Sequence, residues 1–342
     1  MITSPGAGDE QYIFLPALRY PQFRLLWVSG LCAWAGRWID TAVGAWLVLE
    51  LTNSPFLVGL LGACRFASMV MGPFCGAVCD RADRRVVLMT TQVIYGMASL
   101  AVLALFALGS IEVWHLFLFT LLGGLCYTFD FSARYSIAAG IVKSHHILSS
   151  ISLMQAAGGI TSVVGPLIGG GLLEVIGAKG CFALMAAGFL LSFMTLLPLK
   201  IGDKACPSGR ISIWGELFSG LRYIVRDRLL FSLVVIAAMV NLLLFPYIYT
   251  LMPIFARDVL GVSAGRFGQL MAGAGLGAVL GSLVIGSLQQ SANRGRFLIG
   301  AVMAWPLILV VLPYAGSFFL WRCWWPRESL RGYRWRLSRL CS

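Results

Sequence analysis

Long apolar runs separated by short polar stretches dominate this chain. An α-helix needs about 20 apolar residues to cross the hydrocarbon core of a bilayer, and most of the runs approach or exceed that length. They lie at about residues 25–49, 57–79, 86–108, 113–130, 149–176, 180–199, 229–253, 267–289 and 297–320. The pattern predicts an all-α, polytopic protein with nine spans and the lipid bilayer as its surroundings.

Composition agrees with this class. Hydrophobic residues make up 59% of the 342 residues and charged residues only 12%, and the mean hydropathy is +0.85. The 39 glycines suit helices that approach each other closely in lipid. Most of the nine cysteines lie in or beside apolar runs. They predict neither a disulfide framework nor a metal site, and we expect no cofactor.

The distribution of Lys and Arg predicts the orientation. With the N-terminus in the cytoplasm, the inner loops hold most of the basic residues. The outer loops up to residue 320 hold only Lys179, Arg257 and Arg266. By the positive-inside rule we therefore expect a cytoplasmic N-terminus.

A polar stretch after the sixth run divides the chain. Apolar residues recur at helical spacing over residues 211–226, which predicts an amphipathic helix on the membrane surface. We therefore expect a cytoplasmic N-terminus (1–24), a six-helix bundle (25–199), a cytoplasmic linker (200–228), an incomplete second bundle of three spans (229–320) and a basic tail (321–342).

The two predicted bundles resemble each other. Leu51, Ser54 and Gly59 recur 209 positions later as Leu260, Ser263 and Gly268, and Gly76, Asp80 and Arg84 recur 210 positions later as Gly286, Gln290 and Arg294. A parallel internal repeat of this kind is typical of transporters whose halves rock about a central site. Chance similarity among membrane helices is the alternative.

The tail differs from the rest of the chain. From residue 321 it carries six arginines and one acid, Glu328, so it supplies much of the net charge of +12. That charge therefore does not indicate nucleic-acid binding. With nine spans the tail would lie outside, against the orientation that the other loops predict. A frameshift or truncation near residue 320 explains this, and a basic anchor for anionic lipid is the alternative.

Residues 76–85 resemble a known loop. The sequence Gly-Ala-Val-Cys-Asp-Arg-Ala-Asp-Arg-Arg matches the pattern G-x-x-x-D-R-x-x-R-R of the major facilitator superfamily, between its second and third helices. Residues 51–55, Arg65, Arg134 and the glycines of residues 165–170 are similar to the branch that contains the enterobactin exporter and macrolide efflux pumps of bacteria. The resemblance covers about residues 23–320.

The resemblance implies a fold and a function. We expect two helical bundles and proton-coupled efflux of a small amphipathic compound, such as a drug or a siderophore, by a monomer in the bacterial inner membrane. The proton gradient would be the energy source. In this family the pattern of Gly165, Pro166, Gly169 and Gly170 goes with export, and it predicts a kinked helix with a flat face.

The loop at residues 76–85 also has a predicted mechanical role. Asp80 is expected to accept hydrogen bonds from Arg84 and from a helix of the other bundle. The loop, with Gly76, Arg81 and Arg85, would then act as a conformational latch. The alternative is that its charges only set the topology.

Ionisable residues inside the spans are functional candidates because burying them is costly. Asp40 is the candidate for proton coupling, with Arg37 and Arg65 as its cationic neighbours. A permanent Arg37–Asp40 ion pair is the alternative. Arg65 is expected either to neutralise Asp40 or to meet an anionic substrate. Asp130 and Arg134, at the inner end of the fourth run, are expected to form a gate or a topogenic pair.

Three further residues are candidates for the lining of a central cavity. In this family spans one, four and seven line the cavity, and Trp38, Tyr127 and Asn241 fall in those spans. An aromatic lining suits bulky amphipathic compounds. Interfacial anchoring is the alternative role for the aromatic residues.

Other functional classes have less support. The three histidines form no H-E-x-x-H motif. The sequence also lacks a nucleophile elbow, a pair of catalytic carboxylates and a phosphate-binding loop. We therefore expect no enzyme activity. An inactive fragment or a membrane interaction protein without transport activity remains the alternative to a transporter.

Overall fold

A computed structural model describes residues 16–199, 222–228, 230–232, 234–235, 238–239 and 250–287. The chain divides into two units, residues 1–283 and 284–342, and nearly all described residues belong to the first. These described residues form helices and turns, without a β-strand among them. The predicted all-α fold is therefore confirmed for this part.

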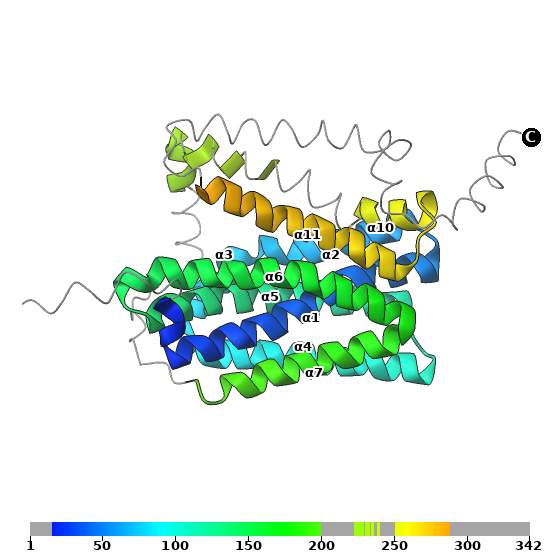
Figure 1. Cartoon of the computed structure of the whole chain (residues 1–342), viewed down its shortest axis with the longest axis horizontal. Helices are drawn as coiled ribbons and strands as arrows, with labels where there is room; N and C mark the ends of the chain where they lie inside the picture. The colour runs from blue at the N-terminus through cyan, green and yellow to red at the C-terminus, as the bar shows by residue number, and fades with distance from the viewer. Residues whose placement is uncertain are drawn as a thin grey trace, which may run out of the picture. The chain divides into compact units, whose positions relative to one another are not determined.

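The first unit is built of long helices joined by short turns (Figure 1). A 3₁₀ turn at Pro16–Arg19 comes first, and another at Ser144–His146 precedes the sixth helix. The helices are α1 (Pro21–Thr52), α2 (Pro55–Val70), α3 (Gly72–Arg81), α4 (Arg84–Leu108), α5 (Val113–Ile141), α6 (Ile147–Val175), α7 (Ala178–Leu196), α10 (Met252–Ile254) and α11 (Ala264–Ser287), with a turn of π-helix at Phe255–Val259 after α10.

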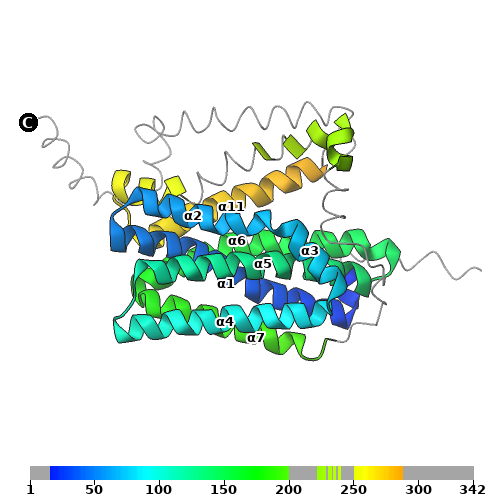
Figure 2. The ribbon, with the colours of Figure 1, turned by 180° about the vertical axis from the view of Figure 1, so that it is seen from behind.

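Helix α1 is the centre of this unit. It contacts α2, α5, α6 and α7, and it lies among the other helices in both views (Figures 1 and 2). Every residue from Ile39 to Leu49 is buried, so this half of α1 is surrounded by protein. Protein partners on all sides explain how a helix with Arg37 and Asp40 in its middle can lie within a membrane bundle.

Four described helices are long and apolar enough to cross a membrane, and they include α4, α5 and α7. The fourth covers residues Ser144–Val175, and α2 and α3 together make a fifth if they count as one bent span. Helix α1 is not among them, because its charged residues lower its hydropathy. The predicted run at 297–320 and most of the run at 229–253 lie outside the described residues, as does the amphipathic segment before residue 222.

The second predicted span is broken rather than continuous. Helices α2 and α3 meet at Met71 with a bend of 43°. Gly72 and Pro73 follow immediately, and a proline inside a helix removes a backbone hydrogen bond and clashes with the preceding turn. The hydropathy of residues 57–79 gives no sign of this break, whereas the Gly-Pro pair does.

A serine precedes the second helix of each predicted half. Ser54 precedes α2, and its side chain accepts a hydrogen bond from the backbone N–H of Leu57. Ser263, 209 positions later, directly precedes α11. The internal repeat therefore coincides with the start of a helix in both copies.

Candidate functional site

A buried ion pair joins α1 to α2. Arg65 Nη1 lies 2.9 Å from Asp40 Oδ2, and the two side chains are 6% and 1% exposed. The Tyr95 hydroxyl, from α4, donates to the same carboxylate oxygen over 3.0 Å. Arg65 also donates to Thr41 Oγ1 over 2.7 Å. We call Asp40, Thr41, Arg65 and Tyr95 the Asp40 cluster, which links three helices at the middle of the bundle.

The second oxygen of this carboxylate has a different environment. Asp40 Oδ1 is buried and has no hydrogen-bond partner among the described residues. Gly44, one turn further along α1, would place a Cβ 3.3 Å from this oxygen, so the absence of a side chain leaves it room. A buried carboxylate oxygen without a hydrogen-bond partner is costly.

Arg37 does not form the ion pair with Asp40 that their spacing suggested. Among the described residues its hydrogen bond is to the Gly123 carbonyl of α5, over 2.8 Å. Its guanidinium lies over the Tyr127 ring, 4.0 Å from the centroid. Arg37 therefore contacts α5, whereas Asp40 pairs with Arg65 of α2. The alternative prediction of a permanent Arg37–Asp40 ion pair is wrong. Arg65 instead takes the neutralising role.

A cavity of about 210 Å³ opens beside these groups. Arg37, Trp38, Arg65 and Tyr127, all candidates from the sequence, line it. Asn241, the remaining cavity candidate, lies outside the described residues. The rest of the lining comes from Trp34, Thr41, Phe66, Met69, Phe131, Tyr135, Gln155 and Gly158.

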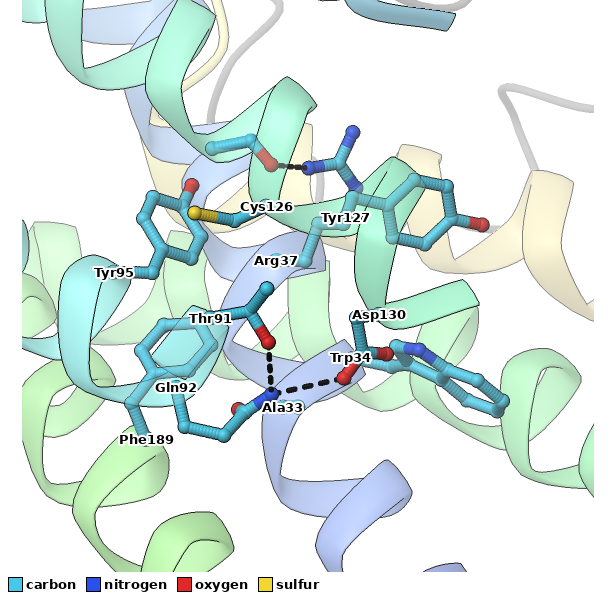
Figure 3. Close-up of a pocket in the computed structure, with 11 residues that line it drawn as sticks. Ala33, Trp34, Arg37, Thr91, Gln92, Tyr95, Cys126, Tyr127, Asp130 and Phe189 are labelled. Atoms are coloured by element: carbon cyan, nitrogen blue, oxygen red, sulfur yellow. Dashed lines mark hydrogen bonds between the residues drawn. The ribbon is translucent and has the colours of Figure 1, made fainter. Parts of the chain in front are cut away.

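A smaller cavity of about 20 Å³ lies between the Asp40 cluster and a second polar cluster (Figure 3). Arg37, Tyr95, Gln92 and Asp130 are among the residues that line it. A polar cavity needs about 10–15 Å³ to hold one water molecule, so this one has room for a water between the two clusters.

The second cluster is centred on Arg134 of α5. Its Nε and Nη2 donate to the two oxygens of Asp130 over 3.0 and 2.6 Å, and its Nη1 donates to the Leu26 carbonyl of α1 over 2.8 Å. Gln92 of α4 donates to Asp130 over 2.8 Å. Arg134 is fully buried, in a helix that continues to Ile141. Helix α5 therefore extends beyond residue 130, where the fourth apolar run was predicted to end.

The Asp80 loop has the local contacts of a capped turn. Arg84 donates to Asp80 over 3.1 Å, and this pair is 36% and 70% exposed. Asp83 caps α4 through the Arg85 N–H, and Arg85 donates to the Leu197 carbonyl at the end of α7 over 2.6 Å. The predicted Arg84–Asp80 contact is present. The predicted contact from Asp80 to a helix of the second bundle stays a prediction. The weaker copy at Gln290 and Arg294 lies outside the described residues.

Glycines bring α6 close to α1. Helix α6 continues as one helix through Pro166. A Cβ at Gly165 would overlap Trp38, and one at Gly169 would lie 3.3 Å from the Ile39 Cα. The motif therefore provides the flat face that the sequence predicted, whereas the predicted kink stays a prediction.

The same face of α6 meets α11. A Cβ at Gly170 would lie 2.9 Å from the Gly268 Cα, so these two helices touch through their backbones. Nearby, Glu174 at the end of α6 accepts hydrogen bonds from Ser263 Oγ over 3.0 Å and from the Gly265 N–H over 3.1 Å. These contacts lie at the end of the bundle opposite the Asp80 loop, which we call the far end.

Arg257 makes a second connection at the far end. It donates to the Leu49 carbonyl over 2.6 Å and to Asn53 Oδ1 over 3.0 Å, at the end of α1. Asn53 has a left-handed backbone, with φ of 50°, and it caps α1. Helices α1 and α6 are thus both tied to the segment around α11.

The described residues contain no group of three or more His, Cys, Asp or Glu side chains that could hold a metal. The polar partners that complete the Asp40 cluster and the Arg134 cluster were not singled out from the sequence. These residues are Ser29, Thr41, Gln92 and Tyr95. Their signal was a polar residue inside an apolar run, which is too common in helical membrane proteins to select them.

Comparison with known proteins gives the family. Residues 14–322 match the family described as transmembrane secretion effector. The chain belongs to this family, within the major facilitator superfamily. The resemblance to the major facilitator superfamily and the predicted all-α polytopic fold are therefore confirmed, and the chain is a multi-pass membrane protein. The count of nine spans stays a prediction.

Relatives and solved structures agree with this family. The chain is 26% identical over 274 residues to the enterobactin exporter EntS of Shigella flexneri, covering 78% of this chain and 60% of that protein. EntS of Escherichia coli O139:H28 has the same identity, with 61% of it covered. The chain thus spans about 60% of the length of these relatives.

Two solved transporter structures share the fold of this chain. A bacterial homologue of the human lysosomal transporter Spinster, in its inward-facing and occupied conformation, matches with a TM-score of 0.63 and 18% identity over 81% of this chain and 62% of that one. A D-xylose-proton symporter matches with a TM-score of 0.54 and 16% identity over 75% and 66%. At these identities the likeness supports the fold alone.

Proposed function

We propose that this protein is a secondary active transporter that exports a small amphipathic compound, a drug or a siderophore, across the bacterial inner membrane in exchange for protons. In this proposal it is a monomer with a cytoplasmic N-terminus. The Asp40 cluster carries the proposal. It combines a buried carboxylate, a cationic partner and an oxygen without a partner among the described residues, beside a cavity of about 210 Å³.

The chemistry of this cluster suits proton coupling. Protonation of Asp40 removes its charge, so the ion pair with Arg65 weakens and Arg65 is left as an uncompensated cation. Movement of α2 relative to α1 can then follow from a single proton, because the pair joins these two helices. Because Arg65 also lines the adjacent cavity, a substrate there would sense the charge state of Asp40 through Arg65.

Contacts at the far end support alternating access. The Arg257–Asn53 hydrogen bond, the bonds of Glu174 to α11 and the Gly170–Gly268 approach join α1 and α6 to the segment around α11. These contacts must separate before a central cavity can open at that end. Each is a small set of hydrogen bonds or backbone contacts, so it can break and re-form.

Transport by everted membrane vesicles tests the proposed function. In vesicles acidified inside, a macrolide or a catecholate is expected to accumulate faster when the full chain is present, and added substrate is expected to release protons from the lumen. Vesicles that lack the chain are the control. Substrate uptake that continues unchanged after a protonophore collapses the pH gradient would contradict proton coupling, and no uptake of either compound would contradict export of these classes.

We also propose that the Asp80 loop is a conformational latch. Asp80 is 70% exposed and accepts from Arg84 in the described structure, so its carboxylate remains accessible to a second partner. Asp80→Asn removes the charge but keeps an acceptor, and it is expected to slow uptake in the same vesicles several-fold. Unchanged uptake at an unchanged protein level would leave the loop with a topogenic role only.

A further inference from the structure

We propose that the cavity selects an aromatic compound that carries an oxyanion, such as a carboxylate or an acidic phenol. In this proposal Arg37 holds the oxyanion while Tyr127 and the neighbouring rings contact the aromatic part. The inference rests on the proposed function and names its substrate class. It depends on the charges that face the cavity and on the side chains that form its walls.

The charge of Arg37 lacks a carboxylate partner among the described residues. Arg65 pairs with Asp40 and Arg134 pairs with Asp130, so these two pairs are close to neutral. Arg37 donates one hydrogen bond, to a carbonyl, and is one of the residues that line the cavity. Among the described residues, one positive charge therefore remains without a carboxylate partner at the cavity wall.

The segment from residue 229 to residue 327 supplies almost no acid that could neutralise it. Between residues 229 and 327 the only acidic residue is Asp258. Asp258 already lies 2.7 Å from Arg257, beside the far-end contacts. A charge of this kind, in surroundings of low dielectric constant, attracts anions and disfavours cations more strongly than it would in water.

The guanidinium is also held in an orientation that suits an oxyanion. Its bond to Gly123 and its position over the Tyr127 ring fix its plane. A planar guanidinium whose remaining donors lie side by side can bind two oxygens of one group at once. Pre-orientation of this kind lowers the entropy that binding costs.

The walls and the volume suit an aromatic ring. Trp38, Phe66, Tyr127 and Phe131 line the cavity, and an aromatic lining of this kind favours contact with a planar ring. A cavity of about 150 Å³ is enough to hold benzene. The cavity of about 210 Å³ therefore has room for one substituted ring. The Tyr135 hydroxyl donates to Gln155 Oε1 over 2.7 Å. Because these two groups bond to each other, they compete less with Arg37 for the oxyanion of a ligand.

Equilibrium dialysis of the full chain in detergent tests this selectivity with three small probes. Salicylate carries the oxyanion, salicylamide is its neutral counterpart, and benzylamine is a cation. Salicylate is expected to bind at least tenfold more tightly than salicylamide, because hydrogen bonds to a charged group are about twice as strong as neutral ones. Benzylamine is expected to bind most weakly. Equal binding of the three probes, or no binding of salicylate, would overturn the proposal.

Substitutions of Arg37 assign the preference to one side chain. Arg37→Gln is expected to abolish the difference between salicylate and salicylamide, and Arg37→Lys to retain part of it. Arg24→Gln, at an exposed position near the start of the same helix, is the matched control and should bind as the unchanged chain does. A preference for salicylate that survives in Arg37→Gln would refute the assignment.

The result of the dialysis can be interpreted even if a variant misfolds or the chain shows no transport. If Arg37→Gln loses its helical circular dichroism, Arg37→Lys decides: an undiminished tenfold preference would then count against a bidentate contact with Arg37. Dialysis uses no pH gradient, so selective salicylate binding can be found even when the vesicles show no coupled transport. Conversely, coupled export of a cation without salicylate binding would refute the substrate class and leave the transport proposal intact.

Discussion

Asp40→Asn is expected to reduce proton-driven uptake in everted vesicles to the level of vesicles without the chain. Asparagine has nearly the same shape and can still accept from Arg65 and Tyr95, but it cannot gain or lose a proton in the transport cycle. Substrate exchange without a pH gradient should persist, because the cavity walls are unchanged. Proton-coupled uptake at the normal rate by Asp40→Asn would exclude Asp40 as the coupling residue.

The same substitution has a cost to stability that must be separated from coupling. Removal of one partner from a buried ion pair leaves the other charge uncompensated, which costs about 3–5 kcal/mol in proteins. The double variant Asp40→Asn with Arg65→Gln removes both charges, so it should recover thermal stability without recovering coupling. Glu50→Gln, at an exposed position of α1, is the control for a change of charge on the same helix.

The sequence predicted the helical framework well because apolar length and charge placement are local properties. The repeated positions Ser54 and Ser263 also lie directly before helices, and the cap that Ser54 provides depends only on its own next turn. The break at Met71 escaped the hydropathy reading, because an apolar run can contain two helices. Gly72-Pro73 was the local signal for that break.

The partners of the charged residues could not be predicted in the same way. Arg37 and Asp40 are three residues apart, a spacing that allows a pair on one helix face, yet each has a better partner on another helix. Which helices surround α1 is a property of the whole bundle. The fourth apolar run was predicted to end at residue 130, before Arg134, whereas Asp130 and Gln92 allow Arg134 to lie inside the helix bundle.

Arg134→Met is expected to destabilise the protein far more than Arg84→Met, although each arginine lies four residues after its aspartate. The Asp130–Arg134 side chains are 6% and 0% exposed, whereas the Asp80–Arg84 side chains are 70% and 36% exposed. Loss of a buried partner costs about 3–5 kcal/mol, whereas exposed pairs contribute roughly 0–1 kcal/mol. Unfolding of the purified variants by heat or by SDS, followed by tryptophan fluorescence, measures the difference.

This comparison also decides between a gate and a structural role for the buried pair. Arg134 bonds to the Leu26 carbonyl, and Gly30 would place a Cβ only 3.4 Å from its Nη1, so α1 and α5 fit closely around it. We therefore expect the double variant Asp130→Leu with Arg134→Met to be more stable than Arg134→Met alone, because it leaves no unpaired charge. If Arg134→Met instead unfolds like the unchanged chain but alters vesicle uptake, the pair is a gate. Equal loss of stability in Arg134→Met and Arg84→Met would contradict the proposal that the buried Asp130–Arg134 pair stabilises the packing of α1 against α5.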